Sequence, residues 1–287
     1  MAYFFDPSAP IIVQGMTGRF GEAYTQAMAA YGTRVAAGVT PGKGGAWLHS
    51  LPIFDSASRA VEATGAQVSL IVVPADNAVD AIFEAIDAGI QMIVCVTEGI
   101  PIHDVIRVIY YAQMRGVRLL GPSSAGFMIV GEATVGLIPT TVRLKGGIGI
   151  VARGGSLLYH VSTLLQSASL GMSTLVSLGS DMLSGMSACD VLEYLEADPN
   201  TEQIIYLTDI DGVEGQAVAD YVREEVSKPV IAMLAGQSLP PSISFVHRGL
   251  PISTADPQIK LEQFRRAGIR VAQYPEMLIP MLLNRAE

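Results

Sequence analysis

The stretch that decides the fold is IIVQGMTGRFG, residues Ile11–Gly21. A short apolar run, Ile11–Val13, is followed by glycines at positions 15, 18 and 21, and a helical pattern begins at about Glu22. In a strand–turn–helix segment such glycines permit a tight turn, the close approach of a phosphate, and close packing of the helix on the strand. The stretch therefore predicts the opening of a nucleotide-binding α/β domain with an anion site at the helix start. A glycine turn that serves packing alone is the alternative.

Short apolar runs alternate with helical patterns through the first half of the chain. Such runs are typical of parallel strands covered on both faces, and the alternation predicts one parallel sheet. The expected strands are Ile11–Val13, Thr33–Ala37, Val68–Val73, Met92–Val96 and Val117–Leu120. Helices are expected over Ala78–Ala88, with Asp76 or Asn77 as the cap, and over Ile102–Arg115.

A second series of the same kind follows a break in the pattern. Residues 123–145 lack periodicity and predict a connecting loop with at most one short strand. The sequence therefore predicts two α/β domains, residues 1–122 and 146–287, joined by the segment 123–145. The strands expected in the second domain are Ile148–Val151, Thr174–Leu178, Gln203–Leu207, Pro229–Leu234 and Ile269–Ala272, and its helices include Ser156–Ser167, Cys189–Leu195 and Gly215–Val226.

Composition excludes several classes of protein. Half of the 287 residues are hydrophobic, which is enough for a sizeable core and excludes disorder. The net charge of −9 argues against nucleic acid as a partner, and no apolar run approaches the ~18–20 residues of a membrane helix. The chain start has no secretory pattern, and two cysteines cannot form a disulfide framework. These features predict a cytoplasmic protein without a membrane or nucleic-acid partner.

The loop after the second strand reads VTPGKGG, residues Val39–Gly45. A domain that binds NAD usually has an acidic residue after this strand, to hold the ribose hydroxyls. Here that residue is absent, and Lys43 stands in a glycine-rich loop, which favours a ligand with an additional phosphate on the ribose. NADP and coenzyme A (CoA) both carry one, and a mobile surface lysine is the third possibility.

Several separated motifs resemble those of the succinyl-CoA synthetase (succinate–CoA ligase) α-subunit family. They occur in the family's order over nearly the whole chain and are Gly15–Gly18, Gly38–Gly45, Glu84–Ile90, Thr97–Pro101 and Asp198–Glu202. The resemblance implies a Rossmann-like CoA-binding domain followed by a flavodoxin-like domain. It also implies a partner, a β subunit whose ATP-grasp domain binds ATP or GTP with magnesium.

The resemblance implies a CoA site in the first domain. It places Thr17, Gly18, Arg19 and Phe20 on the CoA phosphates, Lys43 on the ribose phosphate, Val73 and Pro74 along the groove, and Val96, Thr97 and Glu98 near the adenine end. Arg19 and Phe20 differ from the small and amide residues usual in the family, so we expect contacts through their backbone. Ordinary packing at strand ends is the alternative for Val73, Pro74 and Val96.

The resemblance also implies a reaction in the second domain. A histidine takes a phosphoryl group, passes it to a small carboxylic acid, and CoA then attacks the acyl phosphate. Of the four histidines only His247 falls at the family's position, and Asp209 stands where the family has a glutamate that orients it. Tyr159 matches a substrate contact. The phosphate would lie at two helix starts, Gly154–Gly155–Ser156 and Gly179–Gly185, although Ser156 could equally serve as a helix cap alone.

The departures from the family cluster around this reaction. Bulky residues flank His247 where the family has small ones, Gly154 replaces a serine, Asp209 is one methylene shorter than glutamate, and the loop Gly121–Gly126 lacks the usual Asn-Cys-Pro. Two hypotheses follow: an acid–CoA ligase α subunit with an altered phosphohistidine loop, or a CoA-binding homologue that has lost phosphoryl transfer and acts in regulation, assembly or another transfer. A third, an NADP oxidoreductase, explains Lys43 but not the second half.

Overall fold

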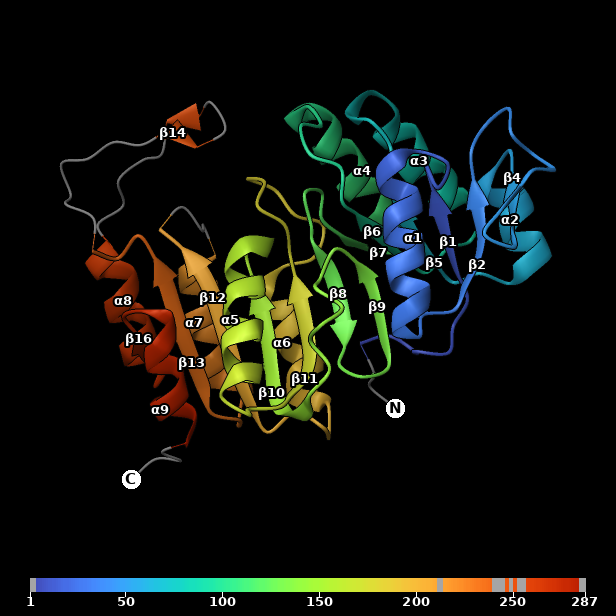
Figure 1. The fold of residues 1–287 in the computed structure, drawn as a ribbon. Coiled ribbons are helices and arrows are strands. Elements are labelled where there is room, and N and C mark those ends of the chain that lie inside the picture. The colour runs from blue at the N-terminus through green and yellow to red at the C-terminus, as the bar shows by residue number, and fades with distance from the viewer. Residues whose placement is uncertain (1–3, 211–213, 239–245, 248–249, 252–256, 284–287) are drawn as a thin grey trace. The chain divides into compact units, whose positions relative to one another are not determined.

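The computed structural model describes residues 4–210, 214–238, 246–247, 250–251 and 257–283. For Val246, His247, Leu250 and Pro251 it describes the main chain only. The chain forms two compact α/β units (Figure 1). The N-terminal unit is Phe5–Arg143 together with Val176–Met186. The C-terminal unit is Leu144–Leu175 and Ser187–Glu287, with Met1–Phe4. The α/β fold class predicted from the sequence is confirmed.

The N-terminal unit is built on a sheet of strand order β3-β4-β2-β1-β5-β6-β7. All neighbouring pairs are parallel except β3 with β4, which form a hairpin. The strands are β1 Ile11–Gln14, β2 Val35–Val39, β3 Trp47–Leu48, β4 Leu51–Phe54, β5 Val68–Ile71, β6 Met92–Cys95 and β7 Arg118–Leu120. The helices are α1 Arg19–Tyr31, α2 Ala57–Thr64, α3 Ala75–Asp87 and α4 Ile102–Met114.

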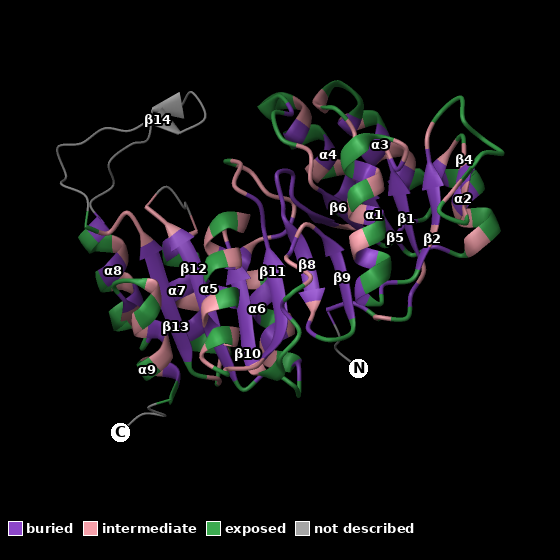
Figure 2. Cartoon of the chain, in the orientation of Figure 1, coloured by how far each residue is buried: buried purple, intermediate pink, exposed green. Residues whose placement is uncertain are grey.

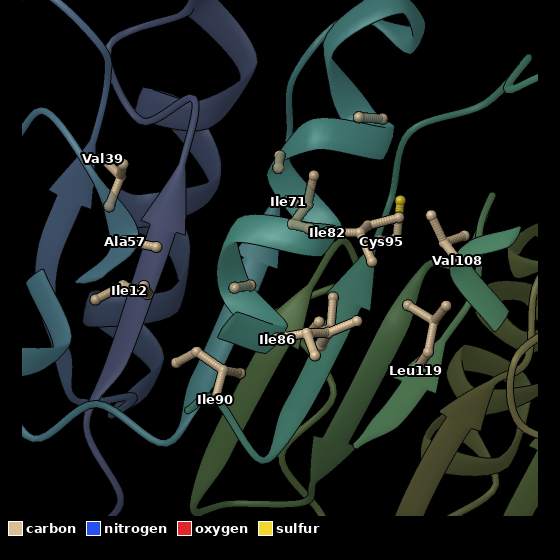
Figure 3. Close-up of a cluster of buried hydrophobic side chains, with 14 of the residues drawn as sticks. Ile12, Val39, Ala57, Ile71, Ile82, Ile86, Ile90, Cys95, Val108 and Leu119 are labelled. Atoms are coloured by element: carbon tan, nitrogen blue, oxygen red, sulfur yellow. The ribbon is translucent and has the colours of Figure 1, made fainter. Parts of the chain in front are cut away.

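Apolar side chains of the strands and of helices α2–α4 form the core of this unit. Figure 3 shows Ile12 of β1, Ile71 of β5, and Ile82 and Ile86 of α3 in this cluster, all at most 2% exposed. A β-strand that buries both faces reads as a continuous apolar run, and β1, β5 and β6 are buried along their whole length. Burial of this apolar surface fixes the strands and hence the loops at their carboxyl ends.

The order of the strands creates a crevice at one position. From β1 the chain proceeds to β2 and β4 on one side and then returns to β5 on the other. The loops that follow β1 and β5 therefore diverge, and in open α/β sheets ligands bind at such a point outside the carboxyl ends of the strands. The glycine turn after β1 lies at this point.

Some local predictions differ from the structure. Helix α1 begins at Arg19, three residues before the expected start, so Arg19 and Phe20 form its first turn. Helix α3 begins after Pro74 without a side-chain cap, so neither Asp76 nor Asn77 has the predicted capping role. Residues 123–143 hold the antiparallel pair β8 (Gly126–Ile129) and β9 (Ala133–Gly136) where a loop with one strand at most is expected. Strands of only four residues, such as β8 and β9, show too few alternations of apolar and polar residues to be recognised in the sequence.

A segment from later in the chain completes the N-terminal unit. Serine hydroxyls join Val176–Met186 to the loop Gly121–Gly126: Ser124 donates to the Ser177 carbonyl (2.5 Å), and the Ser123 and Ser180 hydroxyls lie 2.9 Å apart. The Gly185 amide donates to the carbonyl of Gly121 at 2.9 Å. The residues that replace Asn-Cys-Pro thus serve here to hold a second loop.

The C-terminal unit has strands in the order β16-β13-β12-β10-β11, and the pairs β10–β12, β12–β13 and β13–β16 are parallel. Figure 2 shows its strands buried and its helices exposed along their outer faces. Because β10 is followed by β11 on one side and β12 on the other, the strand order reverses between β10 and β12, and we use the term second crevice for the region outside the carboxyl ends of these two strands. The elements are β10 Lys145–Ala152, α5 Gly155–Ser167, β11 Met172–Ser177, α6 Ala188–Ala197, β12 Gln203–Asp209, α7 Gly215–Glu225, β13 Val230–Ala235, β14 Val246–His247, β15 Leu250–Pro251, α8 Pro257–Arg266, β16 Arg270–Ala272, the 3₁₀ turn η1 Pro275–Met277 and α9 Leu278–Leu283.

Across the parts of the chain that the structure describes, every helix is too short or too polar to cross a membrane.

Gly179 provides a test of how the late segment is held. Its φ is +120°, and a Cβ there would overlap the Pro122 carbonyl oxygen. We expect Gly179→Ala to cost at least the ~1–3 kcal/mol of a strained backbone and to lower the midpoint of thermal unfolding by several degrees. The matched control is Gly89→Ala, where φ is +88° but a Cβ meets nothing within 4 Å. Equal losses for both variants would show that the Pro122 contact is unimportant.

Candidate functional site

The glycine turn after β1 is held by direct main-chain contacts. Gly15 has φ +88°, and a Cβ on it would overlap the Val72 carbonyl oxygen and lie 2.9 Å from the Val73 side chain. A Cβ on Gly21 would overlap the Gly15 carbonyl oxygen. Gly18 is the residue before helix α1, and because it has no side chain the first helical N–H groups are without a side-chain cap. The turn therefore presents backbone donors at the crevice, which suits a phosphate.

The predicted lysine loop contacts this turn. The Lys43 ammonium donates to Thr17 Oγ1 at 3.1 Å, and the Thr17 hydroxyl donates to Thr40 Oγ1 at 3.2 Å. Asp55, which the sequence reasoning missed, accepts a hydrogen bond from the Gly44 amide at 2.8 Å and fixes the far side of the loop. Lys43 thus lies within reach of a group bound at the helix start, and its side chain is exposed.

A second link ties the lysine loop to α1. His49, at the tip of the β3–β4 hairpin, lies 2.7 Å from Glu22 Oε1, and its ring also contacts Gln26 of α1. Both residues of the hairpin tip, His49 and Ser50, have positive φ, a conformation that residues other than glycine seldom adopt. The contacts with α1 hold this conformation. The chain between Lys43 and His49 therefore passes beside the first turn of α1.

The ends of β5 and β6 supply the other side of the crevice. Val73 lies against Gly15, and the Thr97 hydroxyl donates to the Val73 carbonyl at 2.7 Å. The Ser123 amide donates to the Thr97 carbonyl at 3.0 Å, and its hydroxyl reaches Glu98 at 3.5 Å. Val73, Val96 and Thr97 are half-buried, whereas Pro74 and Glu98 are exposed. The structure thus brings the residues predicted for CoA to one edge of the sheet.

Arg19 and Phe20 are both exposed in the first turn of α1. The Phe20 ring stacks on Tyr24, one turn further along the helix, with 6.1 Å between ring centroids and an angle of 19°. This packing directs the ring along the helix surface. The main-chain amides of Arg19 and Phe20 therefore lie at the start of α1.

The C-terminal unit has a corresponding turn at the end of β10. Gly154 is the residue before α5, with φ +88°, and the helix start carries no side-chain cap. Ser156 lies inside the first turn and is exposed, so it does not act as the cap. A serine at position 154 would be strained in this backbone, so the departure from the family matches the local conformation. Tyr159 follows one turn later and is half-buried.

Two cations that the sequence reasoning did not select lie at Asp209, the last residue of β12. Arg153 Nε is 3.5 Å from Asp209 Oδ1, and their side chains are only 14% and 27% exposed. Lys260 of α8 donates to the main-chain carbonyl of Asp209 at 2.9 Å. Arg153 follows β10 directly, which is the signal that could have identified it, whereas Lys260 arrives from a distant helix that no local pattern connects with β12.

Glu214 adds a second carboxylate to this group. Its Oε2 accepts a hydrogen bond from the Ala188 amide at the start of α6, at 3.2 Å. Burial raises the pKa of the Glu214 carboxyl above its ordinary value, against the opposing effects of the Ala188 amide and of Arg153 and Lys260. The end of β12 therefore holds two carboxylates and two cations, a set that can orient an imidazole and balance an added anionic group.

His247, the predicted phosphorylation site, is the second residue of β14 and pairs with Leu250 of β15. Its side chain lies outside the described residues, as do Arg248 and Gly249.

The cysteines are not suited to nucleophilic chemistry. Burial raises the pKa of Cys95 to about 12 and that of Cys189 to about 11, so both thiols stay protonated at neutral pH. Among the described residues, no cluster of three or more His, Cys, Asp or Glu side chains could hold a metal ion.

Two family models match successive parts of the chain. Residues 6–99 match the CoA binding domain, and residues 145–282 match the succinyl-CoA ligase like flavodoxin domain. A CoA binding domain followed by a succinyl-CoA ligase like flavodoxin domain places the chain in the succinyl-CoA ligase class. Within that class, the chain belongs to the family of succinate–CoA ligase α subunits, as its relatives show.

These relatives match over nearly their full length. The chain is 41% identical to the succinate–CoA ligase [ADP-forming] subunit alpha of Aquifex aeolicus over 279 residues, which cover 96% of this chain and 92% of the relative. It is 40% identical over 277 residues to subunit alpha 1 of Archaeoglobus fulgidus, covering 95% and 94% of the two chains. The family predicted from the motifs is confirmed.

Solved structures share the fold. ATP citrate lyase from Methanothrix soehngenii, in complex with citrate and coenzyme A, superposes with a TM-score of 0.83 at 22% identity, over 99% of this chain and 52% of that one. The dinucleotide-forming acetyl-coenzyme A synthetase 1 of Ca. Korarchaeum cryptofilum gives 0.75 at 22% identity, over 94% and 59%. The chain thus spans about half the length of these larger proteins.

The raised pKa of Glu214 predicts a pH-dependent effect of Glu214→Gln. A carboxyl with a higher pKa in the folded state binds more protons when folded, so the free energy of unfolding falls as the pH rises from about 4.5 through the folded value. Glutamine keeps an acceptor for the Ala188 amide and does not titrate. We therefore expect the variant to gain stability over the wild type at pH 7.5 but not at pH 4, measured by urea unfolding. A gain of the same size at both pH values would contradict the assignment.

Proposed function

We propose that this chain is the α subunit of an acid–CoA ligase that forms a nucleoside diphosphate, and that it binds CoA at its N-terminal unit. The observation that carries the proposal is the junction of the glycine turn, the Lys43–Thr17 contact and the Val73–Thr97 contact at one crevice. Backbone donors at the start of α1 would hold the CoA diphosphate, and Lys43 would pair with the phosphate on its ribose. Val96 and Glu98 would contact the bound cofactor from the end of β6.

The proposed reaction divides one condensation into three displacements. A neutral imidazole nitrogen of His247 attacks the terminal phosphorus of the nucleotide, and the nucleoside diphosphate leaves. A carboxylate oxygen of the acid then takes the phosphoryl group from the histidine. Finally the CoA thiolate attacks the acyl carbon and phosphate leaves. Asp209 would orient the imidazole, the amides of Gly154, Gly155 and Ser156 would hold the transferred phosphate, and Tyr159 would contact the acid.

The partner is proposed from the relatives' designation as alpha subunits, which implies a beta subunit. We propose that this subunit holds ATP or GTP with magnesium in an ATP-grasp domain. The relatives act on succinate according to their names, and a small carboxylic acid of this kind is proposed for the present chain. Its two free cysteines favour a reducing compartment, the cytoplasm.

The second candidate function is a CoA-binding subunit that no longer transfers phosphate. The replacement of serine by Gly154 removes a hydroxyl from the phosphate cradle, and the Asp209 carboxylate lies beside Arg153. Both features would also be found in a subunit retained for regulation or assembly.

Phosphorylation of His247 distinguishes the two candidates. With an ATP-grasp β subunit and ATP labelled on its terminal phosphate, we expect acid-labile label on this chain, and we expect His247→Ala to lose at least about 99% of it because the nucleophile is removed. His160→Ala is the matched control, since His160 is exposed on α5 and is expected to leave labelling unchanged. An unlabelled wild-type chain with a partner active on another α subunit would favour the second candidate.

Lys43 can be tested through the ribose phosphate. Because a charge-assisted hydrogen bond contributes about 1.5–3 kcal/mol, Lys43→Met is expected to weaken CoA binding roughly 10–100-fold and to leave dephospho-CoA binding unchanged. The only tryptophan, Trp47, lies four residues away and is 69% exposed, so its fluorescence provides a reporter beside calorimetry. Lys145→Met, at an exposed lysine of the C-terminal unit, is the control. Equal affinity of the wild type for both ligands would refute the role of Lys43.

A further inference from the structure

Lys260 makes a contact that the proposed reaction does not yet use. It lies in the first half of α8, the helix that follows the His247 segment, and its ammonium reaches the carboxyl end of β12. There it donates to the Asp209 carbonyl at 2.9 Å, and the residue is half-buried. Lysine is strongly hydrated and usually keeps its ammonium in water, so a half-buried lysine whose ammonium donates to a main-chain carbonyl needs a structural reason.

The route of the Lys260 side chain depends on a glycine. Gly215 is the first residue of α7, and a Cβ built on it would lie 2.6 Å from Lys260 Cε and 3.0 Å from Cγ. Any larger residue would displace the lysine stem. Gly215 has no positive φ, so its backbone conformation does not require glycine. Space for Lys260 is therefore the role that the structure gives to Gly215.

Asp209 is contacted by residues from two different parts of the C-terminal unit. Arg153 approaches its carboxylate from the end of β10, and Lys260 holds its main chain from α8. After Asp209 the ladder between β12 and β13 ends. A strand end fixed only by its ladder frays, whereas an additional bond from a separate helix restricts the last peptide and the direction of its side chain.

We propose that Lys260 is a positioning residue for the reaction: it holds the end of β12 so that the Asp209 carboxylate is directed at its task beside the phosphorylated histidine. This inference rests on the proposed function. It adds that the Lys260 ammonium couples α8, the helix after the histidine segment, to β12, the strand that carries Asp209. Gly215 leaves the space that the Lys260 side chain occupies.

The test uses the full chain with an ATP-grasp β subunit and labelled ATP, with the rate of His247 phosphorylation as the first readout. Lys260→Met keeps the length of the stem and removes the ammonium, and we expect the rate to fall on the order of tenfold. Gly215→Ala should lower it similarly although Lys260 is still present and alanine is the better helix former. CoA binding by the N-terminal unit should not change in either variant.

Lys228→Met is the matched control. The Lys228 ammonium donates to the carbonyls of Leu195 and Asp198, each at 2.7 Å, so it is also a half-buried lysine that holds main chain within the C-terminal unit. We expect this variant to lose stability but to phosphorylate at the wild-type rate below its unfolding temperature. If Lys228→Met and Lys260→Met slow phosphorylation in proportion to their loss of stability, Lys260 is merely structural and the proposal is overturned.

The pH profile separates a positioning effect from general loosening. The charges of Arg153 and Lys260 lower the pKa of Glu214 and that of Asp190 raises it, and Asp209 is the other carboxylate of this group. The proposed attack needs a neutral imidazole oriented by Asp209, and loss of the Lys260 ammonium removes a positive charge from this group and so favours the protonated imidazole. The acid limb of the phosphorylation rate should therefore move to higher pH in Lys260→Met and stay in place in Lys228→Met. A wild-type chain that takes no label overturns the proposed function itself. A labelled wild type with an equally fast Lys260→Met overturns only the inference about Lys260.

Discussion

The close contact of main chain with main chain at Gly15 is the constraint on which the N-terminal unit depends. A side chain on Gly15 would overlap the Val72 carbonyl oxygen, and a side chain on Gly21 would overlap the Gly15 carbonyl oxygen. This contact lets α1 start directly against the ends of β1 and β5, and so its free amides face the crevice. An added methyl group would separate the helix from the strand and remove the alignment of the amides with Lys43. The apolar core supplies the free energy of folding, but this contact places the amides at the start of α1 beside the ends of β1 and β5.

The two crevices use the same topology for different electrostatic tasks. In the N-terminal unit, the Lys43 ammonium contacts the uncharged hydroxyl of Thr17, while the carboxylates of Glu22 and Asp55 are engaged by His49 and by the Gly44 amide. In the C-terminal unit, Asp209 and Glu214 face Arg153 and Lys260, and the charges nearly balance. An ammonium held by a hydroxyl suits a cofactor whose phosphate stays bound through a catalytic cycle. A balanced set suits a phosphoryl group that must arrive and leave, since a strongly positive site would retain it.

The sequence predicted elements whose pattern is local. Buried parallel strands such as Val68–Ile71 and Met92–Cys95 are continuous apolar runs, and the glycine turn shows its spacing directly. The Lys43 loop was accessible for the same reason. Contacts between distant segments were not: Asp55 on Gly44, His49 on α1 and Lys260 on Asp209 join residues that are 11, 27 and 51 positions apart. The strands β8 and β9 were missed because four-residue strands show too few alternations, and the start of α1 because arginine and phenylalanine carry no cap signal.

The departures from the family at the second crevice form a connected set. Gly154 adopts a φ of +88°, which a serine would resist, and the guanidinium of Arg153 immediately before it lies 3.5 Å from Asp209. The shorter Asp209 needs such support, because it extends one methylene less than glutamate from a strand end that Lys260 must also hold. Burial that raises the pKa of Glu214 then has a consequence for the phosphate. A carboxyl with a raised pKa takes up a proton more readily as negative charge gathers beside it, so its repulsion of an arriving phosphoryl group is reduced, while Arg153 and Lys260 attract that group.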